Sequence, residues 1–312
     1  MKILVTGGQG MMGRTLYDLI ENDQDNDYVF LSRQMCNLLN RQQVLNYFEN
    51  NNFDYIIHLA ALVGGLFKNM NQNINMFSDN IKINENVLEA CHKNGIKKGI
   101  FCLSSCIYPA NPSKFPMDET MIHESPPHKS NEGYSYAKRM LELQTRQYNS
   151  KYNYQYICVI PVNLYGPYDN FNLEDSHLIP GLMHRFEMTK YMKKSFEAYG
   201  TGKPLRQFLY SYDFGKIILK ILFDNNTDSS PIICCNNKEY EIREVVNLLA
   251  EIMNINKDLI IWDSNKSDGC LRKTVTNEKL IRRYPDIIFS SLEDSLKETY
   301  DWFVNNFESI RK

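Results

Sequence analysis

Residues 2–13, with the sequence K-I-L-V-T-G-G-Q-G-M-M-G, decide the fold of this chain. The stretch begins with a short apolar run at residues 2–6 and turns directly into glycines. A helical pattern follows at residues 12–21, so the sequence predicts a buried strand, a tight turn and a helix. A strand, turn and helix in this order form the first unit of many parallel sheets.

The rest of the first half repeats this alternation of strand and helix. Short apolar runs predict strands at residues 28–32, 54–60, 99–103 and 156–161. Apolar residues at helical spacing predict helices at residues 42–48, 74–91 and 134–152. The pattern predicts an α/β fold with a Rossmann-like, doubly wound parallel sheet.

The second half of the chain is less regular. Residues 163–177 are rich in Pro, Gly, Asn and Asp and predict a loop. Helical spacing recurs at residues 178–188, 214–223 and 242–253, and again from Leu292 to Phe307. We expect a cofactor-binding domain at residues 1–165, rejoined by residues 208–235, and a smaller C-terminal α/β substrate domain at residues 166–207 and 236–312.

The glycines at positions 7, 10 and 13 have the spacing that a bound dinucleotide requires. Gly7 permits the tight turn, Gly10 lets backbone N–H groups approach a pyrophosphate, and Gly13 lets the helix pack closely on the strand. Glycine spacing alone is a weak signal, but here it stands directly between a strand and a helix. We therefore expect a nicotinamide dinucleotide at this turn.

The end of the second predicted strand indicates which dinucleotide binds. A site for NAD places Asp or Glu about 20 residues after the glycines, where it holds the ribose 2′-hydroxyl. This chain has Ser32 and Arg33 there, and its next acidic residue is Glu49. Arg33, together with Arg14 after the glycine turn, suits a 2′-phosphate through charge-assisted hydrogen bonds. The sequence therefore favours NADP(H).

Tyr134 and Lys138 stand four residues apart in a predicted helix, which places both on one face. A tyrosine hydroxyl has a pKa of about 10. We expect the Lys138 ammonium to lower the pKa of Tyr134, so that this hydroxyl exchanges a proton with a substrate oxygen near neutral pH. Ser104 ends the fourth predicted strand and completes a Ser/Tyr/Lys set.

Composition argues against several other classes of protein. The 312 residues include 35 Lys and Arg against 37 Asp and Glu, and this net charge of −2 argues against binding to nucleic acid or a membrane surface. The apolar runs are far shorter than a membrane span. Eight cysteines without a CxxC pattern suggest neither a zinc site nor a disulfide framework, so we expect no metal and a cytoplasmic location.

Together these motifs carry a resemblance to a known family. The chain resembles the extended short-chain dehydrogenases/reductases and, among them, the GDP-L-fucose synthases, which are NADPH-dependent 3,5-epimerase/4-reductases acting on GDP-4-keto-6-deoxy-D-mannose. The resemblance covers nearly the whole chain and implies a homodimer. The matching segments lie at residues 6–13, 58–65, 104–109, 133–138, 161–171, 175–180, 199–202, 206–208 and 266–269.

The resemblance implies a catalytic role for each of five side chains. Tyr134 would donate a proton to the C4 oxygen, Lys138 would lower the Tyr134 pKa and bind the nicotinamide ribose, and Ser104 would hydrogen-bond the C4 carbonyl. Cys106 and His177 would be the acid/base pair that inverts C3 and C5. A thiol and an imidazole suit this task because both exchange protons near neutral pH.

The resemblance also implies the contacts to cofactor and substrate. The cofactor contacts would be Gly7, Gly10, Met11, Met12, Gly13, Arg14, Arg33, Ala60, Tyr134, Lys138, Pro161, Asn163 and Leu164. The nucleotide-sugar contacts would be Ser104, Asn163, His177, Leu178, Arg185, Tyr199, Arg206, Lys266 and Asp268. Arginine suits the diphosphate because its planar fork binds an oxyanion through two hydrogen bonds.

Other functions stay open at this point. A GDP-mannose 3,5-epimerase would share the cysteine chemistry but recycle its bound dinucleotide. A 4,6-dehydratase would need a carboxylate beside the serine, and residues 104–108 contain none. A 4-epimerase usually has an acidic residue at the position of Arg33. The fold also permits a non-catalytic dinucleotide-binding scaffold, although a scaffold has little reason to keep the five catalytic side chains together.

Overall fold

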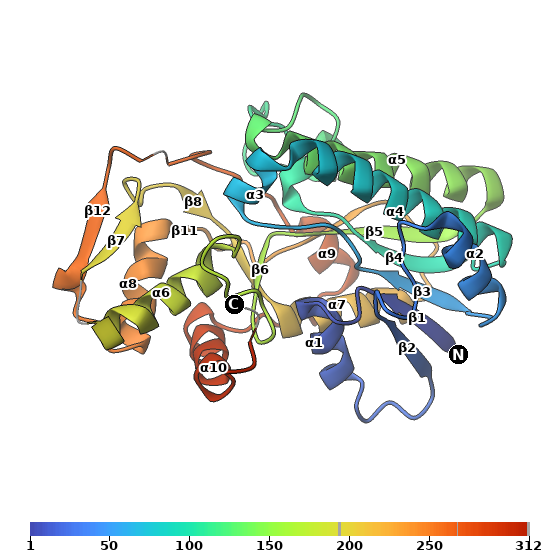
Figure 1. Cartoon of the computed structure of the whole chain (residues 1–312). Helices are drawn as coiled ribbons and strands as arrows, with labels where there is room; N and C mark the ends of the chain where they lie inside the picture. The colour runs from blue at the N-terminus through green and yellow to red at the C-terminus, as the bar shows by residue number, and fades with distance from the viewer. Residues whose placement is uncertain (193–194, 267, 311–312) are drawn as a thin grey trace.

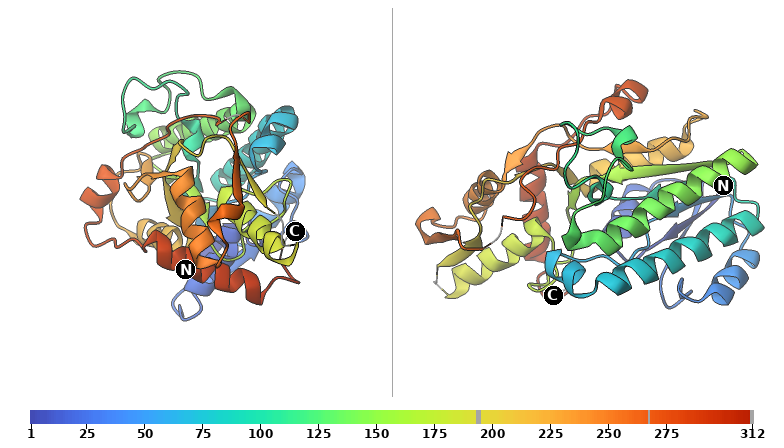
Figure 2. Two further views of the ribbon diagram at one scale, coloured as in Figure 1. Left: turned by 90° about the vertical axis from the view of Figure 1, so that its left-hand side faces the viewer. Right: turned by 90° about the horizontal axis from the view of Figure 1, so that it is seen from above.

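The structure is a computed structural model that describes residues 1–192, 195–266 and 268–310. A large sheet covered by helices makes up one part of the molecule, and a smaller lobe lies at one end of it (Figures 1 and 2). The chain crosses between the two parts several times, so each is built from separated segments.

A six-stranded parallel sheet forms the centre of the large part. Its order is β2-β1-β3-β4-β5-β10, which confirms the doubly wound sheet predicted from the alternating pattern. The strands are β1 (Lys2–Thr6), β2 (Asp27–Leu31), β3 (Tyr55–His58), β4 (Lys98–Cys102), β5 (Gln155–Pro161) and β10 (Ile232–Cys234). The order reverses between β1 and β3, so their carboxyl ends leave a crevice at this point.

Helices cover both faces of this sheet (Figure 1). One face carries α2 (Arg41–Glu49), α4 (Asn73–Lys93) and α5 (Glu132–Tyr152), and the other carries α1 (Met11–Leu19) and α7 (Ser211–Phe223). Each helix contains a predicted helical pattern or overlaps most of it. Between β3 and α4 lies a short helix, α3 (Leu66–Asn71), which the sequence pattern does not predict.

The smaller lobe combines short strand pairs with three helices. In it β7 (Phe196–Tyr199) pairs with β12 (Ile260–Asp263), and β8 (Leu205–Arg206) pairs with β11 (Tyr240–Glu241). Its helices are α6 (Leu178–Met192), α8 (Ile242–Ile252) and α10 (Leu292–Asn305). The remaining helix, α9 (Glu278–Arg283), lies against β10 of the large sheet.

The predicted loop at residues 163–177 is wrong for its first three residues. They form β6 (Asn163–Tyr165), which pairs in parallel with β9 (Phe208–Tyr210). Local composition does not reveal this strand, because its partner lies far away in the sequence. The last helix is also shorter than predicted. The apolar pattern extends to Phe307, whereas α10 ends at Asn305.

Buried apolar side chains form two separate hydrophobic cores. The first surrounds the large sheet and includes fully buried residues such as Ile3, Phe101 and Ile160. The second fills the smaller lobe, with Phe186 and Phe303 fully buried. The site described next lies where the strands of the first core meet the smaller lobe.

Candidate active site

A pocket of about 1030 Å³ opens at the carboxyl ends of the parallel strands. Its walls are the glycine turn after β1 and the segments that follow β2, β3, β4 and β5. Ligands of open α/β sheets bind in this place, where the strand order reverses. The volume is at the upper end for a single ligand, which suits a site for two.

The glycine turn has the geometry expected for a pyrophosphate cradle. Gly7 adopts φ +73°, which favours glycine. A Cβ on Gly13 would lie 2.5 Å from the Gly7 carbonyl oxygen, so only glycine allows α1 to pack here. The first intrahelical bond of α1 runs from Arg14 N to Gly10 O (3.0 Å), and the N–H groups of the first turn thus lack intrahelical partners at the pocket.

The two arginines expected at the 2′-phosphate lie in different environments. Arg33 is exposed and lines the pocket beside Ser32 at the end of β2. Arg14 is also exposed, but its guanidinium lies over the Tyr168 ring, 5.6 Å from the centroid, and it is not a lining residue. Arg33 therefore lines the pocket, whereas Arg14 does not.

All of the other expected cofactor contacts meet in this pocket. The lining includes Gly7, Gly10, Met11, Met12, Gly13, Ala60, Tyr134, Lys138, Pro161, Asn163 and Leu164. They come from four segments that are far apart in the sequence. The doubly wound topology brings them together because every one follows the carboxyl end of a parallel strand or lies on an adjoining helix.

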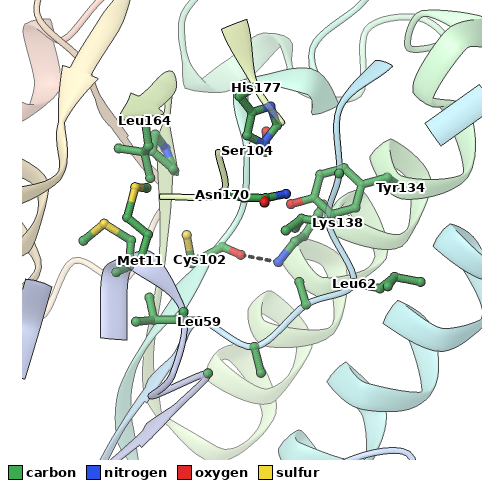
Figure 3. Close-up of a pocket in the computed structure, with 18 of the residues that line it drawn as sticks. Met11, Leu59, Leu62, Cys102, Ser104, Tyr134, Lys138, Leu164, Asn170 and His177 are labelled. Carbon is green, nitrogen blue, oxygen red and sulfur yellow. Dashed lines mark hydrogen bonds between the residues drawn. The ribbon is translucent and has the colours of Figure 1, made fainter. Parts of the chain in front are cut away.

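Tyr134, Lys138 and Ser104 surround one space in the pocket (Figure 3). The buried Lys138 Nζ donates a hydrogen bond to the Cys102 carbonyl oxygen at 2.6 Å and lies 5.8 Å from the centroid of the Tyr134 ring. Ser104 follows β4, and its hydroxyl oxygen accepts a hydrogen bond from Cys106 N at 3.3 Å. The backbone carbonyl at the end of β4 thus fixes the ammonium below the tyrosine.

The expected lowering of the Tyr134 pKa is wrong. Burial raises the pKa of Tyr134 well above its ordinary value, and the neighbouring thiols of Cys106 and Cys102 raise it further. Burial also lowers the pKa of Lys138. The desolvation of the phenolate therefore outweighs the attraction of the nearby ammonium, and Tyr134 keeps its proton at neutral pH.

Cys106 and His177 reach the same pocket from opposite parts of the chain. Cys106 lies in the single turn of 3₁₀ helix Ser105–Ile107 after β4, and it is half-buried. His177 is exposed at the beginning of α6, above Ser104 in Figure 3, and its carbonyl oxygen accepts a hydrogen bond from Gly181 N at 3.0 Å. The expected thiol and imidazole thus line one pocket with the Ser/Tyr/Lys set.

His58 lies beneath the site and has a structural role. Thr6 Oγ1 accepts hydrogen bonds from the N–H groups of Leu59 and Ala60 (both 3.2 Å), so its own proton points to His58 Nδ1 at 2.8 Å. Nε2 then carries the imidazole proton and donates to Asn84 Oδ1 at 3.2 Å. Burial, with a contribution from the Lys138 charge, lowers the pKa of His58 to about 3.

Several expected substrate contacts lie outside the pocket lining, in the smaller lobe. Lys266 Nζ lies 5.6 Å from the Tyr199 ring centroid, and Asp268 accepts hydrogen bonds from Thr201 N (2.6 Å) and Oγ1 (2.7 Å). Arg185 Nε is buried and has no hydrogen-bond partner among the described residues. Leu178 begins α6 and is half-buried, whereas Ser267 of the matching segment 266–269 lies outside the described residues.

Arg206 does reach the pocket, together with residues that the sequence analysis missed. Burial lowers the pKa of Arg206 and also that of Lys273, which lies close to Cys106 and to Arg206. Lys273 stands in an irregular segment outside every matching motif, so no local signal could have found it. Lys68 and Asp175 also line the pocket and form an ion pair with each other in its wall.

Comparisons with known proteins agree with this geometry. Residues 3–234 match the NAD dependent epimerase/dehydratase family. The chain is 43% identical to the GDP-L-fucose synthase of Dictyostelium discoideum, over 99% of this chain and 97% of that protein. This chain belongs to the NAD dependent epimerase/dehydratase family, and within it to the GDP-L-fucose synthases. The family membership predicted from the sequence motifs is confirmed.

Two further relatives show how widely the family is spread. The GDP-L-fucose synthase of Escherichia coli (strain K12) is 32% identical over 99% of this chain and 98% of that protein. The crystal structure of a GDP-L-fucose synthetase from Naegleria fowleri bound to NADP superposes with a TM-score of 0.92 at 37% identity, over 100% of this chain and 96% of that one. The similarity therefore includes the smaller lobe as well as the sheet.

The described residues contain neither a metal-binding cluster nor a membrane-spanning helix. Within residues 1–192, 195–266 and 268–310, His, Cys, Asp and Glu do not gather into a group that could hold a metal ion. The same part of the chain contains no helix with the length and apolarity to cross a membrane. All eight cysteines are free thiols.

Proposed function

We propose that this GDP-L-fucose synthase family member converts GDP-4-keto-6-deoxy-D-mannose to GDP-L-fucose, by epimerisation at C3 and C5 and NADPH-dependent reduction at C4. One observation carries this proposal. Two chemically different sets of side chains, Ser104/Tyr134/Lys138 for the ketone and Cys106/His177 for the neighbouring carbons, line a single pocket. A reductase alone has no need of the second set.

The cofactor proposed for this site is NADP(H). The glycine cradle fits a dinucleotide, as Gly7 and Gly13 leave no room for side chains and the α1 N-terminus faces the pocket. Arg33 would bind the 2′-phosphate through charge-assisted hydrogen bonds. When bound, NADPH supplies the hydride that reduces C4.

The raised pKa of Tyr134 supports a role as the proton donor in the reduction. Its pKa is raised, so the phenol holds a proton to donate to the C4 oxygen as negative charge develops there. Ser104 would hydrogen-bond the same oxygen. Lys138, which is fixed by the Cys102 carbonyl, places positive charge beneath the ring and stabilises the anion left by proton transfer.

Epimerisation uses the acidity that the C4 ketone gives to its neighbours. Removing the proton from C3 or C5 produces an enolate, which hydrogen bonds from Ser104 and Tyr134 would stabilise. Inversion then requires that a proton leaves one face of the carbon and returns to the other. We assign these two transfers to Cys106 and His177.

The GDP moiety is proposed to extend from the pocket into the smaller lobe. Arg206 lines the pocket, and the buried Nε of Arg185 has no hydrogen-bond partner in the described part of the chain, so both guanidinium groups suit a diphosphate. Tyr199 is 50% exposed and offers a ring for the base, with Lys266 and Asp268 beside it. Asn163 and Leu178 would complete the contacts to the sugar nucleotide.

Domain boundaries follow from the same proposal. Residues 1–165 and 208–235 would form the cofactor domain, and residues 166–207 and 236–312 the substrate domain. The two hydrophobic cores support this division except near its boundaries, where Tyr165, Phe208 and Tyr210 pack in the second core. Val275, Leu280 and Tyr284 pack in the first core, so the substrate segment returns to the sheet before it forms α10.

We further propose a cytoplasmic homodimer. Eight free thiols suit a reducing compartment. Ile74 and Phe77 are 80% and 41% exposed on α4, and such apolar side chains suit contact with a second copy. Light scattering of the purified protein would measure the mass, and a monomer at micromolar concentration would contradict this part of the proposal.

The activity is tested by adding GDP-4-keto-6-deoxy-D-mannose and NADPH, with NADH in a parallel assay. Loss of NADPH absorbance with a fucose-configured product by NMR is the expected result. Deuterium uptake from the solvent without oxidation of NADPH would instead indicate an epimerase such as a GDP-mannose 3,5-epimerase. Binding of NADP(H) with neither signal would favour the scaffold.

A further inference from the structure

The segment that carries His177 crosses from β6 to α6 without regular structure. It ends at an exposed imidazole, which must nevertheless be placed accurately against the sugar. Its local bonds centre on Asn172, whose Oδ1 accepts from Glu174 N (2.8 Å) and Asp175 N (3.2 Å) and whose carbonyl oxygen accepts from Ser176 N (3.1 Å). These bonds shape the segment but do not tie it to the cofactor side of the pocket. The position of His177 therefore depends on contacts with the rest of the molecule.

Those contacts converge on Asp175, two residues before the imidazole. Lys68 Nζ, on α3, makes an ion pair with Asp175 Oδ2 at 2.9 Å. Asn170 Nδ2 donates to the other carboxylate oxygen at 2.6 Å. The backbone N–H of Gly65 donates to the Asp175 carbonyl oxygen at 2.9 Å. Both ends of Asp175 are thus held from outside the segment by α3 and its N-cap Gly65, and Asn170 adds a bond within the segment.

Glycine at position 65 brings the two backbones close together. A Cβ on Gly65 would lie 2.6 Å from the Ser176 carbonyl oxygen. Asn69 Nδ2 donates to the carbonyl oxygens of Gly64 (2.7 Å) and Gly65 (3.0 Å), which holds the beginning of α3 in place. The N-terminal end of α3 therefore packs directly on the residues before His177.

The ion pair joins the two sides of the pocket. Lys68 follows the loop after β3, which lies on the cofactor side, whereas Asp175 precedes α6 of the smaller lobe. Both side chains line the pocket, and they are 25% and 29% exposed. A partly desolvated pair that is also hydrogen-bonded is a stronger restraint than a fully exposed one.

We propose that Lys68 and Asp175 form a latch that positions His177 for proton transfer at C3 and C5. Neither residue exchanges a proton with the substrate; they are positioning residues that act through the segment 169–177. This inference rests on the proposed function for its chemical readout. Because the latch holds the segment that carries His177, its loss should disturb epimerisation far more than hydride transfer, which depends on Tyr134 and the cofactor side of the pocket.

The test compares Lys68→Met with the double variant Lys68→Glu/Asp175→Lys, which restores a pair of opposite charges. Lys216→Met is the matched control, because Lys216 is an exposed lysine on α7 that does not line the pocket. Three quantities are measured for each protein: hydrogen exchange of the backbone amides at residues 170–177, the ratio of solvent deuterium at C3 and C5 to hydride at C4, and the KM for NADPH.

We expect Lys68→Met to speed amide exchange at residues 170–177 and to lower the deuterium-to-hydride ratio by about 10- to 100-fold, the effect of a misplaced reacting group. The charge-reversed double variant should recover most of both losses, and Lys216→Met should match wild type. Equal losses of deuterium and hydride, or unchanged exchange in Lys68→Met, would overturn the latch.

A direct contact between Lys68 and a ligand would produce a different pattern. In that case the KM for NADPH or the sugar would rise, and charge reversal would not repair it, so this result also overturns the proposal. Failure of the proposed function is recognised separately, because wild type would then consume no NADPH. Amide exchange still decides the latch in that case, with faster exchange in Lys68→Met supporting it and unchanged exchange refuting it.

Discussion

Replacing His58 by glutamine is expected to make the protein less sensitive to acid. The imidazole is fully buried, and its pKa is lowered from 6.5 to about 3. Below pH 6.5 the unfolded chain binds a proton at this position that the folded protein does not bind. The free energy of unfolding therefore falls as the pH decreases, until the folded protein is itself protonated near pH 3.

The size of the effect follows from the two pKa values. Each pH unit below 6.5 costs the folded state about 1.4 kcal/mol, and between pH 7.5 and pH 5.0 the accumulated cost of His58 is about 2 kcal/mol. Glutamine carries no titratable proton, so His58→Gln lacks this dependence. The variant should be less stable than wild type at pH 7.5, because it disturbs the bonds to Thr6 and Asn84.

Urea unfolding at pH 7.5 and 5.0, followed by circular dichroism, measures the difference. We expect the stability gap between wild type and His58→Gln to narrow by about 2 kcal/mol at the lower pH. If the free energy of unfolding changed with pH equally in wild type and His58→Gln, the pKa of His58 would be the same in the folded and the unfolded protein. The description of the Thr6–His58–Asn84 chain beneath the site would then be wrong.

Further variants test individual parts of the site. Tyr134→Phe should slow NADPH oxidation by about 10²- to 10⁴-fold, the contribution of a general acid, and an unchanged rate would remove Tyr134 from the mechanism. Cys106→Ser should sharply reduce deuterium uptake at C3 and C5 while leaving some reduction; uptake at the wild-type rate contradicts this. Arg33→Gln should lower the preference for NADPH over NADH about 10- to 100-fold, since a hydrogen bond to a charged group contributes about 1.5–3 kcal/mol. If the ratio of the KM for NADH to the KM for NADPH were the same in the variant and in wild type, Arg33 would not bind the 2′-phosphate. Gly13→Ala places a Cβ 2.5 Å from the backbone of Gly8 and should destabilise the protein by about 1–3 kcal/mol, whereas an unchanged midpoint of thermal unfolding would show that the turn adapts.

The sequence patterns predict the sheet well because its signals are local. The run ending at Thr6 and the glycines after it define a strand and a turn within a dozen residues, and β1 and α1 form there. Tyr134 and Lys138 share one helix, so their common face also follows from spacing. Features of this kind require no knowledge of the rest of the chain.

Features that depend on distant contacts could not be predicted. β6 exists because Asn163 pairs with Phe208, and α3 is a six-residue helix whose position depends on contacts with residues 175 and 176. The raised pKa of Tyr134 is likewise a property of the folded protein, because burial produces it. The spacing of Tyr134 and Lys138 suggests a lowered Tyr134 pKa, because it shows that an ammonium group is near but does not show that the hydroxyl is buried.

The central claim is that one pocket both epimerises and reduces the same sugar. The most direct test is a reaction of the wild-type protein in D₂O with NADPH and GDP-4-keto-6-deoxy-D-mannose, followed by NMR of the product. The account predicts GDP-L-fucose with deuterium at C3 and at C5, formed in step with NADPH oxidation. A reduced product that keeps its original protons and configuration at C3 and C5 would contradict it.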